Sequence, residues 1–183
     1  MNTYIALLRG INVSGQKKIR MVELKKCLEN LLFNHVQTYI QSGNIVFTST
    51  QTDLREIEFL IQDQLKKEYG FDVPTIVLSL STLKRMIDEN PFKEEGDANP
   101  TKVMVTCLSS APSPKDLDIL NQLNLPSEFF EIKEKVLYGY FPNGYGKAKL
   151  SNTFLEKKLK LSATTRNWKT VHHLYALASE TPL

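Results

Sequence analysis

Short β-rich runs alternate with amphipathic helical stripes over residues 1–80, and this order restricts the possible folds more than any other feature. The apolar run from Tyr4 to Arg9 stops at Gly10 and is typical of a strand buried on both faces. Helical spacing of apolar residues then predicts a first helix that ends near Asn34. Its inward residues are Met21, Leu24, Leu28, Leu31 and Leu32.

Two further β-rich runs, 36–40 and 44–48, flank the pair Ser42-Gly43. This pair favours a hairpin, because glycine adopts a positive φ without steric cost. An Asp-x-x-Glu capping signal and a closing glycine predict a second helix over residues 53–70, and residues 75–80 predict a fourth strand. The order is therefore β-α-β-β-α-β, which is the ferredoxin-like arrangement.

The second half of the chain follows the same order less completely and without detectable sequence repetition. The polar, acidic segment 93–99 predicts a linker. The fold class is accordingly α+β, with two ferredoxin-like (βαββαβ-type) subdomains packed together, residues 1–90 and 91–183, and an extra C-terminal helix. The predicted strands are 102–108, 129–133 and 136–141, and the predicted helices are 115–123, one opened by Thr153 and Glu156, and one from about Arg166.

The last helix carries more apolar side chains than one small sheet needs, which predicts that the two subdomains share one continuous or abutting core. A chain of 183 residues is long enough to bury such a core without disulfides. The surplus consists of Trp168, Val171, Leu174, Tyr175 and Leu177.

Composition excludes several classes of protein. Hydrophobic residues make up 42% of the chain and charged residues 23%, which excludes disorder or a collagen-like repeat as a description of the whole. The longest unbroken apolar run, Tyr4 to Leu8, is far shorter than the ~20 residues of a membrane span, and the N-terminus lacks signal-peptide features. Cys27 and Cys107 have no metal-binding spacing. We expect free, buried thiols in a reducing cytoplasm, and no membrane association, metal or cofactor.

Basic residues are unevenly distributed, although the net charge is only +3. Residues 1–27 contain six basic side chains and one acidic one, and residues 146–173 contain seven basic side chains and one acidic one. The remainder of the chain has ten basic and 18 acidic residues. A clustered positive surface attracts anions, so these two windows predict an anion-binding surface formed by both chain ends.

The loop GINVSGQKK, residues 10–18, joins a predicted strand to a predicted helix, which is where phosphate-binding loops occur. It is not a Walker loop, because Gln16 separates the glycine from the lysine and no Ser or Thr follows for magnesium. A flexible loop with free amides and several cations is one interpretation, and a solvated connector is the other. The candidate ligand-binding residues here are Arg9, Asn12, Lys17 and Lys18.

The segment ATTRNWKT, residues 163–170, predicts a second anion site. Thr164 and Thr165 can cap a helix opened by Arg166, and a helix N-terminus attracts anions through its free amides. Ordinary capping, with Trp168 as a core anchor, is the alternative. The candidate ligand-binding residues in the basic window 146–173 are Lys149, Thr164, Thr165, Arg166, Asn167 and Lys169.

Catalytic candidates are few, and we assign no catalytic residue. His35 stands alone, and His172 and His173 diverge by about 100° on a helix, so they cannot both bind one ion. The run YIQSGNIVF, residues 39–47, superficially resembles the aromatic strand of an RNA-recognition sheet. The basic-glycine-aromatic order is missing, so a core role for Tyr39 and Phe47 is the preferred interpretation.

Several motifs point to a known family: YIALLRGINVSG, YIQSGNIVF, FDVP, NPF and the C-terminal GKAKLSNTFLEKKLKLSATTRNWKTV. Over nearly its whole length the chain resembles a widespread bacterial family labelled a domain of unknown function. The family usually reads GINVGG and SKLTN, where this chain has Ser14 and the segment 148–152, AKLSN. The resemblance implies a two-part ferredoxin-like α+β fold and no established activity.

These observations favour a binding protein for phosphate-bearing ligands, nucleic acid foremost, whose affinity depends on salt. A small-molecule or nucleotide-handling enzyme that uses the same cationic cleft is the alternative. A protein–protein adaptor, which would expose an apolar patch, is a third possibility. The sequence leaves the oligomeric state open and is compatible with a monomer.

Overall fold

The computed structural model describes residues 1–182, and its internal contacts divide the chain into two compact units. The first unit comprises Met1–Arg85 and the C-terminal segment from His173, and the second unit comprises Met86–His172. The boundaries fall within α3 (Leu80–Asp88) and α7 (Trp168–Glu180), so each of these helices has residues in both units. The subdomain bounds 1–90 and 91–183, and a core shared by the two subdomains, stay predictions.

The first unit contains one four-stranded antiparallel sheet in the order β2-β3-β1-β4. The long strand β1 is central, as the apolar run at the N-terminus predicts. Together with the two intervening helices this is the ferredoxin-like arrangement, and the prediction for residues 1–80 is confirmed. The elements are β1 (Asn2–Leu8), α1 (Met21–Glu29), β2 (Asn34–Tyr39), β3 (Asn44–Ser49), α2 (Leu54–Tyr69) and β4 (Thr75–Ser79).

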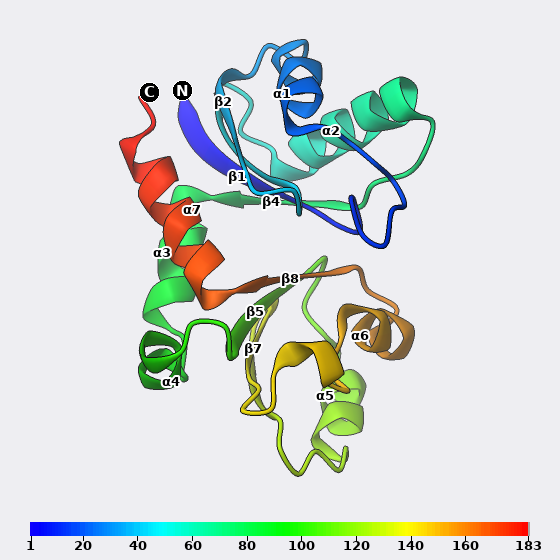
Figure 1. Ribbon diagram of the computed structural model, residues 1–183, viewed down its shortest axis with the longest axis vertical. Coiled ribbons are helices and arrows are strands. Elements are labelled where there is room, and N and C mark those ends of the chain that lie inside the picture. Colours follow the sequence, from blue (N-terminus) through cyan, green and yellow to red (C-terminus); the bar gives the residue numbers. More distant parts are fainter. Residues whose placement is uncertain (183) are drawn as a thin grey trace. The chain divides into compact units, whose positions relative to one another are not determined.

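Helices α1 and α2 cover one face of this sheet and enclose the first core (Figure 1). The α2 stripe is buried as its spacing predicts, with Ile57, Ile61 and Leu65 all 0% exposed. Asp53 caps the start of α2 by accepting from the Arg55 amide at 2.8 Å, and Gly70 ends it with φ at 77°. A left-handed residue at this position closes a helix most cheaply when it is glycine.

Helix α1 is shorter than the apolar spacing predicts, because it ends at Glu29 instead of near Asn34. Leu32 has a left-handed φ of 59° and is 86% exposed, so it does not belong to the inward stripe. Leu24, Cys27 and Leu28 make the buried face of the helix. The turn after α1 brings β2 back to the sheet.

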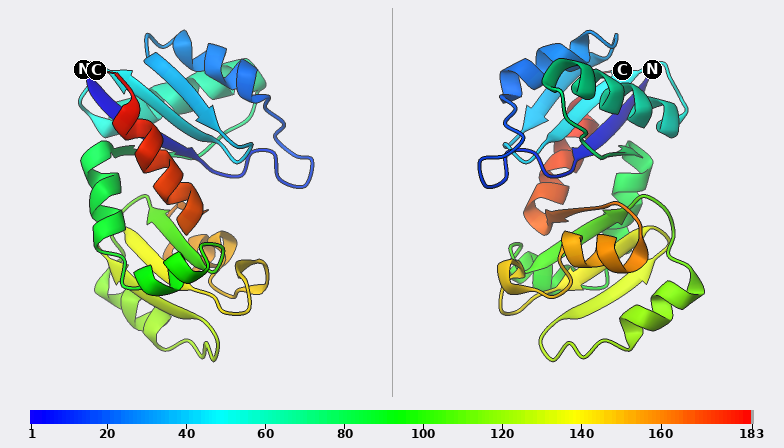
Figure 2. Two further views of the ribbon diagram at one scale, coloured as in Figure 1. Left: turned by 60° about the vertical axis from the view of Figure 1, so that its left-hand side comes forward. Right: turned by 90° about the vertical axis from the view of Figure 1, so that its right-hand side faces the viewer.

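The C-terminal part of α7 lies on the face of the first sheet that is opposite α1 and α2 (Figure 2). The His173 ring stacks on Tyr39 of β2, with 3.7 Å between ring centroids. Near the end of the helix, the Gln37 side chain donates to the Thr181 hydroxyl at 3.2 Å. Tyr39 therefore has a packing role in this unit, and Phe47 is buried in the core. Both agree with the interpretation preferred from the sequence.

The second unit has the same sheet order, β6-β7-β5-β8, and again every pair is antiparallel. Helices α5 and α6 cover one face and enclose the second core (Figure 2). The α+β class with two ferredoxin-like units and an extra C-terminal helix is confirmed. The elements are α4 (Lys93–Ala98), β5 (Val103–Leu108), α5 (Pro114–Asn121), β6 (Phe129–Lys133), β7 (Val136–Tyr140), the 3-10 turn η1 (Tyr145–Lys147), α6 (Asn152–Leu159) and β8 (Ala163–Asn167).

The linker predicted at residues 93–99 is wrong, because residues 93–98 form helix α4. Gly96 of this helix is buried against the Trp168 indole, and the indole N–H donates to the Asp97 carboxylate at 3.1 Å. The polar composition of the segment hides this contact, because a glycine and a carboxylate make it. Within residues 1–182, no helix combines the length and the apolar character needed to cross a membrane.

We expect Gly96→Ala to destabilise the protein, although alanine normally favours a helix. An added Cβ would lie 2.6 Å from Cδ1 of Trp168 and 2.8 Å from its Nε1, so the buried ring must move. The expected loss is about 1–3 kcal/mol of unfolding free energy, measured by urea denaturation. Gly146→Ala is the matched control, since nothing lies within 4 Å of its added Cβ. Equal effects of the two substitutions would contradict the packing described here.

Candidate functional site

The loop between β1 and α1 is folded as a tight hairpin. Val13 and Gln16 form an antiparallel bridge, with the Gln16 amide donating to the Val13 carbonyl at 2.9 Å. The two central residues, Ser14 and Gly15, both have positive φ, 50° and 75°. This is the backbone of a type I′ turn, whose twist suits a hairpin. Ser14 therefore stands where glycine would cost less.

Asn12 holds this hairpin in place. Its side-chain amide donates to the carbonyls of Ile19, at 3.0 Å, and Gln41, at 2.9 Å. Its side-chain oxygen accepts from the Ile19 amide at 2.9 Å, and its own amide donates to the Lys17 carbonyl at 3.1 Å. One side chain thus joins both arms of the loop to the β2–β3 turn. Its left-handed φ of 55° is one that asparagine tolerates better than most residues.

Gly43 allows the β2–β3 turn to approach β1 closely. Its φ is 79°, and an added Cβ would lie 2.6 Å from the Leu8 Cβ. The Leu8 amide donates to the Gly43 carbonyl at 2.8 Å. The predicted role of glycine in this turn is confirmed, and the close approach brings Gln41 beside the loop.

A cavity of about 1100 Å³ lies between this loop, the β2–β3 turn and the start of α1. Its lining contains three basic side chains, Lys18, Arg20 and Lys26, and one acidic one, Glu23, which leaves a formal charge of +2. The other residues that line it are Asn12, Gly15, Ile19, Met21, Val22 and Gln41.

The first turn of α1 borders this cavity, and no side chain caps it. Arg20 occupies the N-cap position in an extended conformation and makes no capping hydrogen bond. The first amides of a helix have no partner within the helix, so they carry partial positive charge. Arg20 pairs with Glu23 at 3.6 Å, but the two side chains are 86% and 53% exposed. Water and salt screen such a pair, and an anion can compete for the guanidinium.

Of the residues predicted for this end of the chain, Asn12 and Lys18 line the cavity. Lys17 does not point there: its ammonium donates to the Asp72 carbonyl at 2.6 Å and lies 5.8 Å from the centre of the Phe71 ring. Arg9 directly follows β1, where its amide donates to the Pro74 carbonyl at 2.8 Å.

The predicted helix N-terminus at residues 164–166 is wrong. Thr164, Thr165 and Arg166 belong to strand β8, opposite Cys107, Thr106 and Val105 of β5. The helix begins at Trp168, and Asn167 caps it by accepting from the Thr170 amide at 2.8 Å. Two adjacent β-branched threonines favour a strand, and the sheet needs this fourth strand to complete its order.

Apart from Thr164, the candidate side chains of the basic window 146–173 are either hydrogen-bonded to neighbouring residues or exposed on the surface. The Thr165 hydroxyl contacts the hydroxyl of Thr106 at 2.7 Å and donates to the Asn152 side chain at 2.6 Å. An Arg166 guanidinium nitrogen donates to the Thr165 carbonyl at 2.9 Å. Lys149 and Lys169 are exposed. Thr164 is buried, and its hydroxyl has no hydrogen-bond partner within residues 1–182.

The two cysteines are free and buried, and neither is activated as a nucleophile. Burial raises the pKa of Cys27; the Glu68 carboxylate adds to this, and a hydrogen bond with Gln64 opposes it. Burial also raises the pKa of Cys107 to about 12, against a smaller opposing effect of Arg166. Both thiols are therefore protonated at neutral pH, whereas a nucleophilic cysteine acts as the thiolate.

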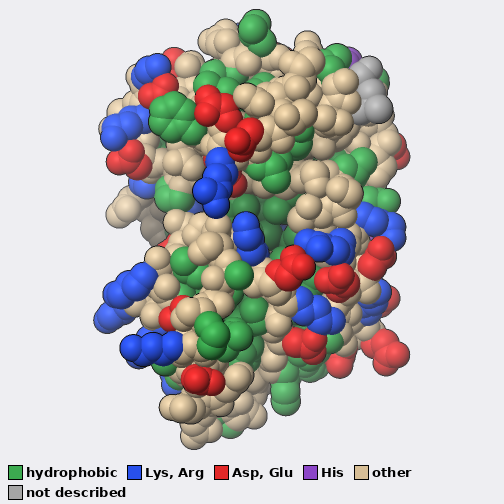
Figure 3. Space-filling view, turned by 180° about the vertical axis from the view of Figure 1, so that it is seen from behind, with side chains coloured by type: hydrophobic (Ala, Val, Ile, Leu, Met, Phe, Trp, Pro, Cys, Tyr) green, Lys and Arg blue, Asp and Glu red, His purple; other side chains and the backbone are tan. Residues whose placement is uncertain are grey.

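Charge is mixed on the face drawn in Figure 3, where Lys and Arg side chains stand among Asp and Glu side chains. A basic site on such a surface has to come from a local cluster. The lining of the cavity at the start of α1 contains such a cluster. Arg20 and Lys26 belong to the basic window 1–27 but are not among the predicted candidate residues, and Gln41 has no signal in the sequence. Helical spacing can place Val22, Glu23 and Lys26 on one face, but not next to Gln41.

We expect Asn12→Ala to destabilise the first unit more than Asn12→Gly. Both substitutions remove three side-chain hydrogen bonds, each worth about 1 kcal/mol net, but glycine keeps the left-handed backbone unstrained. The difference between the variants should be about 1 kcal/mol in chemical denaturation. If Asn12→Gly is as stable as the natural sequence, the side chain does not hold the loop.

Comparison with known proteins finds one family model and a solved structure that are similar to this chain. No curated protein matches the chain. A solved structure, that of the conserved bacterial protein SP0830 from Streptococcus pneumoniae, matches with 26% identity and a TM-score of 0.71. The match covers 97% of this chain and 98% of that protein. Residues 1–138 match the family described as protein of unknown function, DUF1697. This match spans more than half of the chain, and the chain therefore belongs to the DUF1697 family.

Proposed function

We propose that the protein binds phosphate-bearing ligands, nucleic acid foremost, in the cavity between the β1–α1 loop and the start of α1. The observation that carries this proposal is the lining itself, which combines Lys18, Arg20 and Lys26 with an uncapped helix start. Oxygens of a phosphate group accept hydrogen bonds from both kinds of donor. The amides supply fixed geometry, and the three long side chains supply most of the charge.

The basic side chains that line the cavity are exposed, which favours a polyanionic ligand such as nucleic acid. Lys18, Arg20 and Lys26 are all exposed, so they keep most of their hydration until a ligand arrives. Binding of a nucleic acid to such groups gains mainly from the release of condensed counterions. Affinity in this mechanism falls steeply as salt rises, which separates it from binding through apolar contacts.

A nucleotide-handling enzyme is the second candidate, and the concave form of the site favours it. The cavity of about 1100 Å³ is slightly larger than the usual small-molecule site of about 300–1,000 Å³, so it has room for a nucleotide. Free nucleotides should then compete with a nucleic acid for the same residues. A joint surface built by this cavity and the basic window at 146–173 stays a prediction. We place the activity in the cytoplasm, because two free, buried thiols suit a reducing compartment.

We expect Lys26→Ala to weaken binding of a fluorescein-labelled oligouridylate and to flatten its salt dependence. Loss of one phosphate contact should reduce the slope of log affinity against log salt by about 0.7 for a single strand. Fluorescence anisotropy over a series of NaCl concentrations measures both quantities.

Lys25→Ala is the matched control on the same helix. It removes the same charge, but Lys25 pairs with Glu29 at 3.9 Å one turn further along α1. Its affinity and salt slope should stay near those of the natural sequence. If both variants lose affinity equally, binding follows the general charge of α1 and the cavity is not the site. No binding even at low salt would remove the nucleic-acid proposal.

A further inference from the structure

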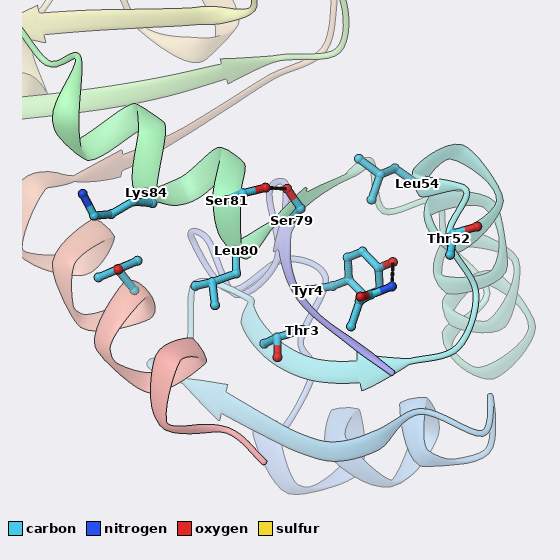
Figure 4. A pocket seen from close by; sticks show the side chains of 10 residues that line it. Thr3, Tyr4, Thr52, Leu54, Ser79, Leu80, Ser81 and Lys84 are labelled. Atoms are coloured by element: carbon cyan, nitrogen blue, oxygen red, sulfur yellow. Dashed lines mark hydrogen bonds between the residues drawn. The ribbon is translucent and has the colours of Figure 1, made fainter. Parts of the chain in front are cut away.

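A second cavity in the first unit, of about 700 Å³, lies beside the first residues of β1, and Figure 4 shows its lining. Most of its lining side chains are uncharged and polar or aromatic. They come from β1, the β3–α2 connection, the first residue of α2, the end of β4 and helix α3, with one residue from α7. They are Asn2, Thr3, Tyr4, Thr52, Leu54, Ser79, Leu80, Ser81, Lys84 and Tyr175.

The backbone topology leaves this space open. Strand β1 pairs with β3 from Asn2 onward, but its pairing with β4 extends no further than Tyr4 opposite Ser79. The chain leaves the sheet at Leu80 to begin α3. The position beside Asn2 and Thr3 that a longer β4 would fill is where the cavity lies. Strand β1, the end of β4 and helix α3 therefore form one part of its wall, and Thr52, Leu54 and Tyr175 complete it.

The hydroxyl groups of Ser79, Ser81 and Thr82 form a hydrogen-bonded cluster at the start of α3. The Ser79 hydroxyl lies 2.9 Å from the hydroxyls of both Ser81 and Thr82, and it accepts from the Thr82 amide at 3.1 Å. Each hydroxyl has one hydrogen to donate and two lone pairs. Two contacts use two of the three hydrogens, and of the three residues Ser79 and Ser81 line the cavity, where their hydroxyls present donor and acceptor sites. A cluster with both properties matches another hydroxyl group.

Two side chains of β1 extend this polar lining. Thr3 is 6% exposed and lines the cavity, so its hydroxyl adds a buried polar group to this wall. The Tyr4 hydroxyl donates to the Gln51 carbonyl at 2.8 Å, which leaves it able to accept. The Asn2 side chain points to that oxygen from 3.5 Å.

The remaining lining disfavours a charged ligand. Lys84 carries the one charge among these lining residues, and Figure 4 shows its amino end pointing away from the Ser79–Ser81 hydroxyls. Leu54, Leu80 and the Tyr175 ring supply apolar surface. Hydroxyl groups on one side and aliphatic or aromatic surface on the other suit a molecule that bears hydroxyls around an apolar face.

We propose that this cavity binds a neutral polyhydroxylated molecule of monosaccharide size. The ligand hydroxyls exchange hydrogen bonds with the Ser79–Ser81 cluster and with Thr3, and the C–H face of the ring packs against Leu54, Leu80 or Tyr175. The proposal uses different residues from the cationic cavity and does not depend on it.

Titration of the ¹⁵N-labelled protein with D-glucose, D-galactose and D-ribose, each followed by NMR, tests this site. At least one sugar should produce saturable shifts at millimolar concentration, confined to residues around Thr3, Thr52 and 79–81. Thr3→Val keeps the shape and removes the buried hydroxyl, and Ser81→Ala removes an exposed one. Each should weaken binding by about three- to tenfold.

Thr50→Val is the matched control for Thr3→Val, since Thr50 is exposed just after β3 and does not line the cavity; it should leave the affinity unchanged. If Thr3→Val fails to fold, Ser81→Ala carries the test alone, because its side chain is on the surface. Three results overturn the proposal: no saturable shift with any of the sugars, shifts that spread over the whole surface, or tighter binding of inorganic phosphate at the same residues.

Discussion

The cationic cavity depends on the hydrogen bonds of a single side chain, that of Asn12. Its amide group ties the two arms of the β1–α1 loop to each other and to the β2–β3 turn. Without these bonds the loop would have to satisfy the Ile19 amide and carbonyl and the Gln41 carbonyl with water. The close contact of Gly43 with Leu8 adds a second constraint, because it fixes how far the turn can move from β1.

The two units share one topology but treat the corresponding helix start differently. In the second unit, α5 follows β5 after a short connection, and Ser113 and Asp116 cap it reciprocally with Pro114 in the first turn. Hydrogen bonds from the Ser113 side chain and backbone lower the pKa of Asp116, which keeps the capping carboxylate charged. In the first unit, α1 has a basic N-cap residue that makes no such bond. The corresponding helix start is thus capped by side chains in the second unit and left without a side-chain cap in the first.

Periodicity predicted most of the fold and little of the site. Short apolar runs and helical stripes located seven of the eight strands, because these patterns reflect burial within one element. Strand β8 was missed because Thr164 and Thr165 fit a helix cap as well as a strand, and its pairing with β5 is non-local. Helix α4 was missed because its contact with Trp168 uses Gly96. Lys18 and Asn12 were identified, but Gln41 joins them through a turn that a linear pattern does not place.

Titration with inorganic phosphate, followed residue by residue in the NMR spectrum of the natural sequence, tests the central claim most directly. The smallest phosphate-bearing probe reports on the cavity alone, since it cannot span to other basic groups. We expect saturable shifts at the amides of Lys18 and of residues 20–23, where the uncapped first turn of α1 meets the basic side chains. Shifts confined to other basic residues, such as Lys147 and Lys149, or no saturable shift at the start of α1, would contradict the account.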